Sequence, residues 1–147
     1  MWHEQCPDDP EIFPAEFNYY LNRSRSEILV ITGDTIPTDE CFLLQDSTGM
    51  TAGQITSRVT WDNELFDKAI SVLETGIGKY PRRLDFRFGE AKAFELTGQY
   101  DRELLVLSEV LDLDSVDSRW LWSENEPVDG NEIIPESIFD YCRVLYE

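Results

Sequence analysis

The chain has 147 residues, a length typical of one domain, and 41% of them are apolar, which is enough to form a buried core. It contains 30 acidic residues against 12 lysines and arginines, so its formal net charge is −18. Binding to nucleic-acid phosphates and to anionic lipid depends on clustered basic residues. The excess of acidic residues therefore excludes direct nucleic-acid binding and membrane docking as default functions.

The charge is spread along the chain. We expect one domain made of residues 1–60, 61–115 and 116–147, whose net charges are −7, −5 and −6. The longest apolar run, Ile28 to Ile31, is far too short for a secretory signal or a membrane span. Cysteines 6, 41 and 142 form no close pair. Reduced thiols in a cytoplasmic protein are therefore expected.

The first stretch predicts a short helix followed by a small antiparallel β element. Apolar residues recur at helical spacing over residues 13–21. The period then changes to short, β-branched runs with turn residues between them. We expect strands over residues 27–32, 41–45 and 54–59, with a turn at residues 46–49.

The middle stretch predicts three helices joined by short linkers. Thr60 or Asp62 can cap the first, whose apolar stripe reaches Ile77, and Gly76 and Gly78 are expected to loosen its end. The second helix is expected over residues 84–96 and the third over residues 100–113. Such short linkers favour antiparallel packing of neighbouring helices.

An internal repeat relates these helices. Residues 66–73 align with residues 100–107 at an offset of 34: aromatic falls on aromatic, Asp on Asp, and Val and Leu recur. A helical period of 34 residues is that of the tetratricopeptide repeat. Residues 62–115 resemble this family, as the second helix of one repeat followed by a complete repeat. The resemblance implies a mainly α fold of antiparallel helical hairpins, here with the β element near the N-terminus.

Several residues fit the family pattern and several depart from it. Ala91 occupies the small helix-crossing position, and residues 98–101 resemble the turn between the helices of a repeat. Glu103 stands where the family has a small residue, Ser115 replaces the closing proline, and Arg87 stands where a large apolar residue is common.

The resemblance also implies a binding surface, because the first helix of each tetratricopeptide repeat lines a concave groove. By this resemblance Asp85, Phe88, Lys92 and Glu95 would face a protein or peptide partner. Phe88 stands where the basic clamp of some members has a lysine, so the peptide need not be a C-terminal one.

A local cluster of bases interrupts the acidic chain. On a functional interpretation, these bases form a patch that binds an acidic peptide or a carboxylate. On the simpler interpretation, each base forms an ion pair with a neighbouring acid such as Glu90 or Glu95. We favour the pairing. The cluster comprises Lys79, Arg82, Arg83, Arg87 and Lys92.

The last stretch is expected to cap the repeat. Trp120, Trp122, Ile133 and Ile134 are candidate capping residues, and a terminal helix is expected after Pro135, through Leu145. The acidic loop at residues 124–132 does not follow the spacing of a calcium loop.

No catalytic residue, metal site or cofactor is predicted. The single histidine, His3, lies beside the first residue of the chain, where a packed catalytic pocket is not expected. The sequence therefore predicts a non-enzymatic protein–protein interaction module. The alternative is an acidic decoy that mimics nucleic acid and blocks a basic surface of a partner. A weaker third hypothesis is a small hydrolase built on the C-terminal acidic loop.

Overall fold

The computed structural model describes residues 8–33 and 41–144, which form a mixed α/β structure that is 60% helical. The described helices are α2 (Ile12–Ser24), α3 (Asn63–Lys79), α4 (Leu84–Leu96), α5 (Tyr100–Val116) and α6 (Gly130–Val144), with a short 3-10 helix η1 (Ser123–Asn125). The described strands are β1 (Arg25–Thr32), β2 (Cys41–Gln45), β3 (Thr51–Trp61), β4 (Arg119–Leu121) and β5 (Pro127–Asp129).

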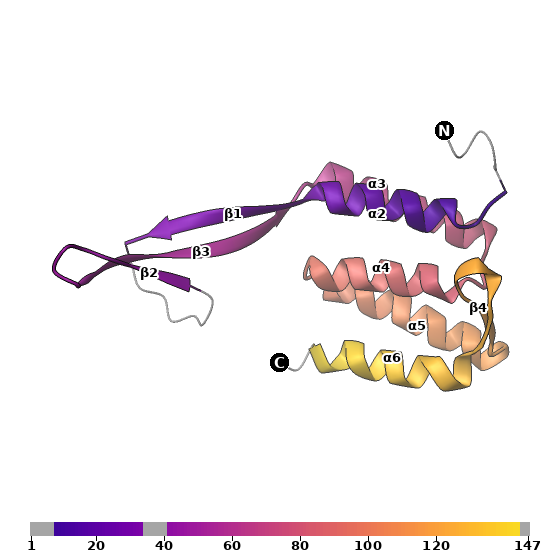
Figure 1. Ribbon diagram of the computed structural model, residues 1–147. Coiled ribbons are helices and arrows are strands. Elements are labelled where there is room, and N and C mark those ends of the chain that lie inside the picture. Colours follow the sequence, from indigo (N-terminus) through magenta and orange to yellow (C-terminus); the bar gives the residue numbers. More distant parts are fainter. Residues whose placement is uncertain (1–7, 34–40, 145–147) are drawn as a thin grey trace.

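The helices lie side by side and form what we call the helical body, residues 8–24 and 62–144. Consecutive helices run in opposite directions: α2 packs along α3, α4 packs along α5, and α6 lies on the far side of this array from α2 and α3 (Figure 1). The predicted packing of helices in pairs is therefore confirmed, and the helical spacing of residues 13–21 does form a helix, α2.

The three-stranded sheet extends away from the helical body (Figure 1). We call its strands, residues 25–32 and 41–61, the β arm. The strand order is β1-β3-β2, and both pairings are antiparallel. All three expected strands are present, but β3 is longer at both ends than its alternating residues predicted. It pairs with β1 as far as Trp61 opposite Arg25, and with β2 as far as Thr51 opposite Gln45. Gly33 and Asp34 carry a turn signal directly after β1 in the sequence, and Asp34 lies outside the described residues.

The expected turn at residues 46–49 connects β2 to β3. The Asp46 carbonyl accepts from the Gly49 N–H at 3.0 Å, and the Asp46 carboxylate accepts from the Thr48 and Met50 N–H groups at 2.8 and 3.0 Å. Gly49 has φ +83°, the left-handed conformation that glycine adopts without strain. These bonds lower the pKa of Asp46, the side-chain bond from the Thr48 hydroxyl most of all.

The α3 helix is capped as predicted by Asp62, whose carboxylate accepts from the Leu65 N–H at 3.0 Å. The α3 helix runs through Gly76 and Gly78 and ends at Lys79, before Pro81, so neither glycine interrupts it. Gly76 instead provides a close approach: a Cβ there would lie 2.9 Å from Phe13 Cγ and 3.1 Å from Phe86 Cε2. The absence of a side chain at Gly76 lets α2 and α4 approach α3.

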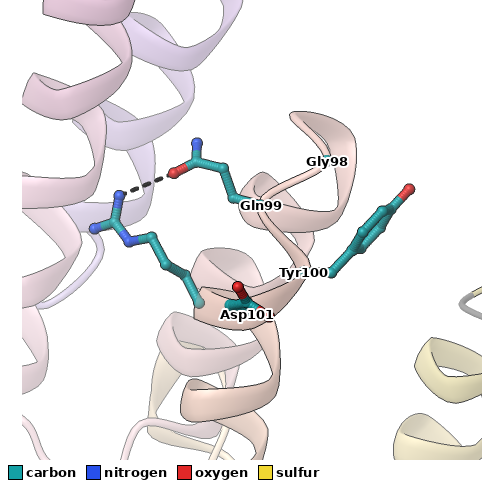
Figure 2. A pocket seen from close by; sticks show the side chains of 5 residues that line it. Gly98, Gln99, Tyr100 and Asp101 are labelled. Carbon is teal, nitrogen blue, oxygen red and sulfur yellow. Dashed lines mark hydrogen bonds between the residues drawn. The ribbon is translucent and has the colours of Figure 1, made fainter.

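The α4 helix has the predicted bounds, and Gly98 ends it with φ +71°. Gln99 and Arg102 at this turn are hydrogen-bonded to each other at 3.1 Å, while Tyr100 points to the opposite side (Figure 2). Residues 98–102 line a hollow beside this turn, and two of its polar side chains, Gln99 and Arg102, bind each other. The α5 helix begins where expected and ends three residues later than predicted, at Val116.

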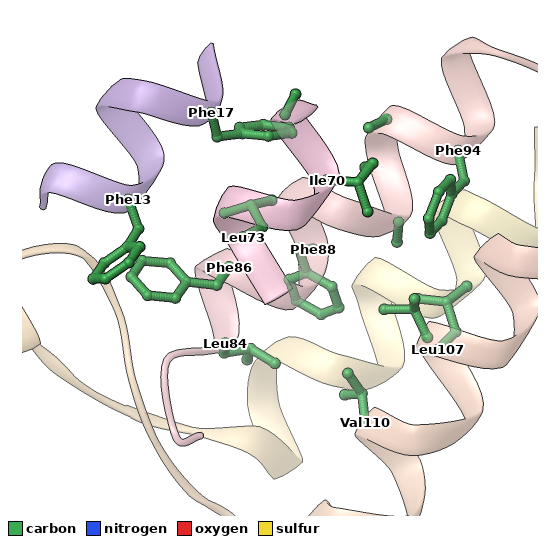
Figure 3. Close-up of a cluster of buried hydrophobic side chains, with 14 of the residues drawn as sticks. Phe13, Phe17, Ile70, Leu73, Leu84, Phe86, Phe88, Phe94, Leu107 and Val110 are labelled. Atoms are coloured by element: carbon green, nitrogen blue, oxygen red, sulfur yellow. The ribbon is translucent and has the colours of Figure 1, made fainter. Parts of the chain in front are cut away.

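The core lies between the helices and is rich in phenylalanine. Phe13 from α2 contacts Phe86 from α4, with ring centroids 6.1 Å apart (Figure 3). The ring centroids of Phe66 from α3 and Phe94 from α4 are 6.2 Å apart. Rings at these separations add to the free energy of burial. The core also contains Phe17, Ile70, Leu73, Leu84, Leu107 and Val110.

The C-terminal stretch caps this core as predicted. Trp120 and Ile134 are each 1% exposed, and the Trp120 indole N–H donates to the Asp114 carboxylate at 2.9 Å. The expected start of the last helix at Pro135 is wrong: α6 begins at Gly130, with the Asp129 carboxylate accepting from the Asn131 N–H at 3.0 Å, so Pro135 lies inside the helix. Leu145, expected on its apolar face, lies outside the described residues.

Candidate functional site

Three of the four partner-facing residues predicted from the sequence line one hollow. Phe88, Lys92 and Glu95 lie on α4 and form one side of a cavity of about 430 Å³. We call it the α4–α6 hollow, because α6 supplies most of the rest of its lining. The other lining residues are Trp122, Ser137, Asp140, Tyr141, Arg143 and Val144.

Three aromatic side chains meet in this hollow. The Phe88 ring centroid lies 6.2 Å from that of Trp122 and 6.0 Å from that of Tyr141. The Tyr141 hydroxyl donates to the Phe88 carbonyl at 3.0 Å. Burial, with the negative charges of Glu95 and Glu103, raises the pKa of Tyr141 to about 12, so the hydroxyl keeps its proton. Phe88 is only 8% exposed, because Trp122 and Tyr141 pack against it.

Two ion pairs flank the aromatic residues. Lys92 Nζ lies 2.6 Å from Glu95 Oε1 on α4, and Arg143 Nη2 lies 3.9 Å from Asp140 Oδ1 on α6. The four formal charges sum to zero. The hollow therefore combines an apolar, aromatic part with donors and acceptors of both signs, as is typical of sites that seat one large side chain.

Asp85, the fourth predicted residue, does not line this hollow. Its carboxylate accepts from Arg83 Nε and Nη2 at 2.8 and 2.7 Å. The Arg83 side chain is fully buried and also pairs with Glu11 at 2.8 Å, whose carboxylate accepts from the Glu124 N–H at 2.8 Å. These ion pairs and hydrogen bonds of Arg83 and Glu11 join the starts of α2 and α4 to η1, so Asp85 has a structural role.

The basic cluster consists of engaged side chains rather than an open patch. Arg82 lies 3.2 Å from Asp117, and Arg87 lies 3.3 Å from Glu109. Lys79 stands over the Phe13 ring, 5.5 Å from its centroid. With Arg83 and Lys92 paired as described above, four of the five bases form ion pairs. Glu95 is a partner as expected, whereas Arg82 and Arg87 pair with Asp117 and Glu109 rather than with Glu90.

Sequence reasoning missed Glu103 as part of this region. Glu103 is fully buried on α5, and neither of its carboxylate oxygens has a hydrogen-bond partner. Burial and then the negative charge of Glu95 raise its pKa, against an opposing effect of Lys92. It thus lies close to two residues that line the hollow. The sequence signal that could have found it is the alignment of Glu103 with the small residue Ala69, 34 residues earlier, which places a carboxylate at a position expected to be buried.

The described residues contain no group of three or more histidine, cysteine or acidic side chains placed to hold a metal ion. In the acidic loop, Asp129 uses one carboxylate oxygen to bind both the backbone and the side chain of Asn131, at 3.0 and 2.9 Å. His3 lies outside the described residues.

None of the helices in the described ranges has an apolar stretch long enough to cross a bilayer. Comparisons of the chain with protein-family models, with curated proteins and with solved structures find no match.

Proposed function

We propose that this protein is a non-enzymatic interaction module that binds a peptide segment of a protein partner at the α4–α6 hollow. The observation that supports it is the meeting of Phe88, Lys92 and Glu95 with Trp122 and Tyr141. Buried aromatic side chains beside charged pairs are typical of the centres of protein interfaces. The hollow fits an aromatic or aliphatic anchor residue, with the ion pairs available to the peptide backbone.

We further propose that the helices are tetratricopeptide-like hairpins, with α2 and α3 as one repeat, α4 and α5 as the next, and α6 in the place of a following first helix. The β arm is then an insertion between the two helices of the first repeat. Burial supports this assignment at three of the five buried positions of α3, whose counterparts 34 residues later in α5 are also buried, whereas Phe66 and Ile70 fall on the exposed Tyr100 and Leu104. The three buried pairs are Ala69 and Glu103, Leu73 and Leu107, and Gly76 and Val110.

Peptide display tests the proposal. A library of disordered protein segments is selected on the full chain, and the affinity of enriched peptides is measured for the wild type and for Trp122→Ala and Lys92→Glu. We expect a shared apolar anchor among the peptides and at least tenfold weaker binding to both variants. The matched control is Leu105→Ser on α5, a residue that is 65% exposed and outside the hollow.

Lys92 is 53% exposed at its side chain, so Lys92→Glu should fold normally, and circular dichroism checks this. Absence of enrichment, or peptides that bind both hollow variants as well as the wild type, would contradict the proposal.

The acidic decoy remains a second candidate because of one observation. A decoy needs a continuous acidic surface, and the basic cluster is the sequence feature that argues against one. Four of the five bases in that cluster are neutralised in ion pairs. The helical body has 23 acidic and 10 basic residues, a net charge of −13. Capture of nucleic-acid-binding proteins that dissociate between low and high salt, unaffected by Trp122→Ala, would favour the decoy over the hollow.

A further inference from the structure

Glu103 on α5 is a buried hydrogen-bond acceptor that the fold leaves unused. Its side chain is fully buried, yet neither carboxylate oxygen has a hydrogen-bond partner among the described residues. Buried polar groups almost always have such a partner, because burying an unpaired one costs free energy. An acceptor that stays unpaired in the free protein is therefore available to a donor that arrives with a ligand.

Glu103 lies next to the α4–α6 hollow. Burial is the main cause that raises its pKa, and the charges of Glu95 and Lys92 then act on it in opposite directions. The pKa of Tyr141 is raised by burial and then by the charges of Glu95 and Glu103. Lys92, Glu95 and Tyr141 all line the hollow, whereas Glu103 does not. Because Glu103 is fully buried, its carboxylate lies inward of these three side chains.

Lys92 is the part of this lining that can move. Its side chain is 53% exposed, and its ammonium group pairs with Glu95 on the same helix at 2.6 Å. Ion pairs at the surface contribute little to stability. A side chain that enters the hollow can therefore turn Lys92 towards the peptide backbone and reach the Glu103 carboxylate.

The hollow and the buried carboxylate together fit an aromatic side chain with a donor at its far end. The walls carry the rings of Phe88, Trp122 and Tyr141, and the cavity has a volume of about 430 Å³. Aromatic rings pack favourably against one another. A carboxylate only accepts hydrogen bonds, and the tryptophan indole has one N–H group that only donates. Tryptophan thus matches both parts of the site.

The same pairing already occurs elsewhere in the helical body. The indole N–H of buried Trp120 donates to the Asp114 carboxylate at 2.9 Å. A phenylalanine in the hollow would leave Glu103 unpaired. A lysine or arginine would supply a donor, but Lys92 and Arg143 already neutralise the carboxylates of the lining.

We propose that the α4–α6 hollow is specific for a tryptophan side chain of the partner peptide, whose ring packs against the aromatic walls and whose indole N–H donates to Glu103. This inference rests on the proposed function, because it names the anchor residue of the bound peptide. The carboxylate that is unfavourable in the free protein gains its donor in the complex. A site built around such a hydrogen bond discriminates strongly against analogues that lack the donor.

Two small probes that differ in one hydrogen test this on the full chain. They are N-acetyltryptophanamide and its analogue methylated at the indole nitrogen, and NMR titration gives their dissociation constants. We expect the wild type to bind the unmethylated probe at least tenfold more tightly. Glu103→Met removes the acceptor and should bind the two probes equally, whereas Glu103→Gln, whose amide oxygen still accepts, should keep a preference. N-acetylargininamide should bind the wild type more weakly than the tryptophan probe.

The control variants separate this inference from the proposed function. Trp122→Ala should lose both tryptophan probes, and Glu136→Met, at an exposed position of α6 outside the lining, should bind like the wild type. Thermal unfolding shows that each variant is folded. A preference that survives in Glu103→Met, no response of the hollow up to the solubility limit of the probe, or tighter binding of the arginine probe would overturn the tryptophan assignment. The peptides selected by display would still report on the hollow itself through Trp122→Ala.

Discussion

Glu90 is a buried carboxyl group in the helical body, 8% exposed on α4. Burial raises its pKa to about 7, and so do the negative charges of Glu74 on α3 and Glu109 on α5. Arg87 and Arg102 act in the opposite direction. Glu90 therefore takes up a proton on folding at mildly acidic pH, unlike an exposed glutamate.

This protonation predicts the sign of a pH effect on stability. The folded pKa of about 7 lies above the reference value of 4.5, so the stabilisation is complete below pH 4.5 and is lost as pH rises through 7. We expect the free energy of unfolding of Glu90→Gln to fall less over this window, by on the order of 1–3 kcal/mol. Urea titrations from pH 4.5 to 8 measure it.

The control for this prediction is Glu132→Gln on α6, an exposed glutamate, which should follow the wild-type pH profile. Parallel profiles of Glu90→Gln and the wild type would refute the prediction.

Substitution of the buried Glu103 is expected to maintain or raise the free energy of unfolding. A buried polar group without a hydrogen bond costs about 1–3 kcal/mol, so removing this carboxylate offsets the loss of its methylene groups. We expect Glu103→Ala to be neutral or stabilising and Glu103→Met, which fills the same space, to be stabilising by about 1 kcal/mol. Chemical denaturation gives both values.

Glu136→Met on an exposed part of α6 is the reference and should change stability by less than about 0.5 kcal/mol. A loss of more than about 2 kcal/mol in Glu103→Ala, the scale of a broken buried network, would contradict its assignment to the small helix-crossing position.

At the scale of elements, the two glycines of α3 should respond oppositely to the same change. Gly76→Ala places a Cβ 2.9 Å from Phe13 Cγ, and overpacking of this kind costs about 1–3 kcal/mol. Gly78 has nothing within 4 Å of such a Cβ, so Gly78→Ala should stabilise the helix by about 0.5–1 kcal/mol. Thermal unfolding of the two variants gives the signs, and a destabilising Gly78→Ala or a neutral Gly76→Ala would refute them.

Local signals decided which elements the sequence could predict. The end of α4 follows from Gly98, which comes directly after it, and the capping of α3 follows from Asp62. The length of β3 depends on pairing with β1, which is distant in sequence, and its outer residues do not alternate in the apolar pattern. The packing role of Gly76 depends on rings from α2 and α4, so no property of its own helix indicates it.

At the scale of the whole molecule, the site was predictable only in part. Phe88, Lys92 and Glu95 share one face of α4, which the repeat pattern indicates. Trp122 and Tyr141 come from the C-terminal stretch, and their packing against α4 depends on how that stretch folds back along the helices. These two side chains cover Phe88. The groove predicted along α4 is therefore replaced by a hollow that has α6 as its second wall.

The junction between the helical body and the β arm has a consequence for strand alignment. The β1 strand follows α2 directly, and the Asp62 N–H before α3 donates to the carbonyl of buried Ser24 at 2.8 Å. A sheet exposed on both faces has little of its own to prevent slippage by one residue, which would exchange its two faces. Here such slippage would also pull Phe13 away from Gly76. The packing of α2 on α3 therefore fixes the register of β1 against β3, and with it which side chains lie on each face of the β arm.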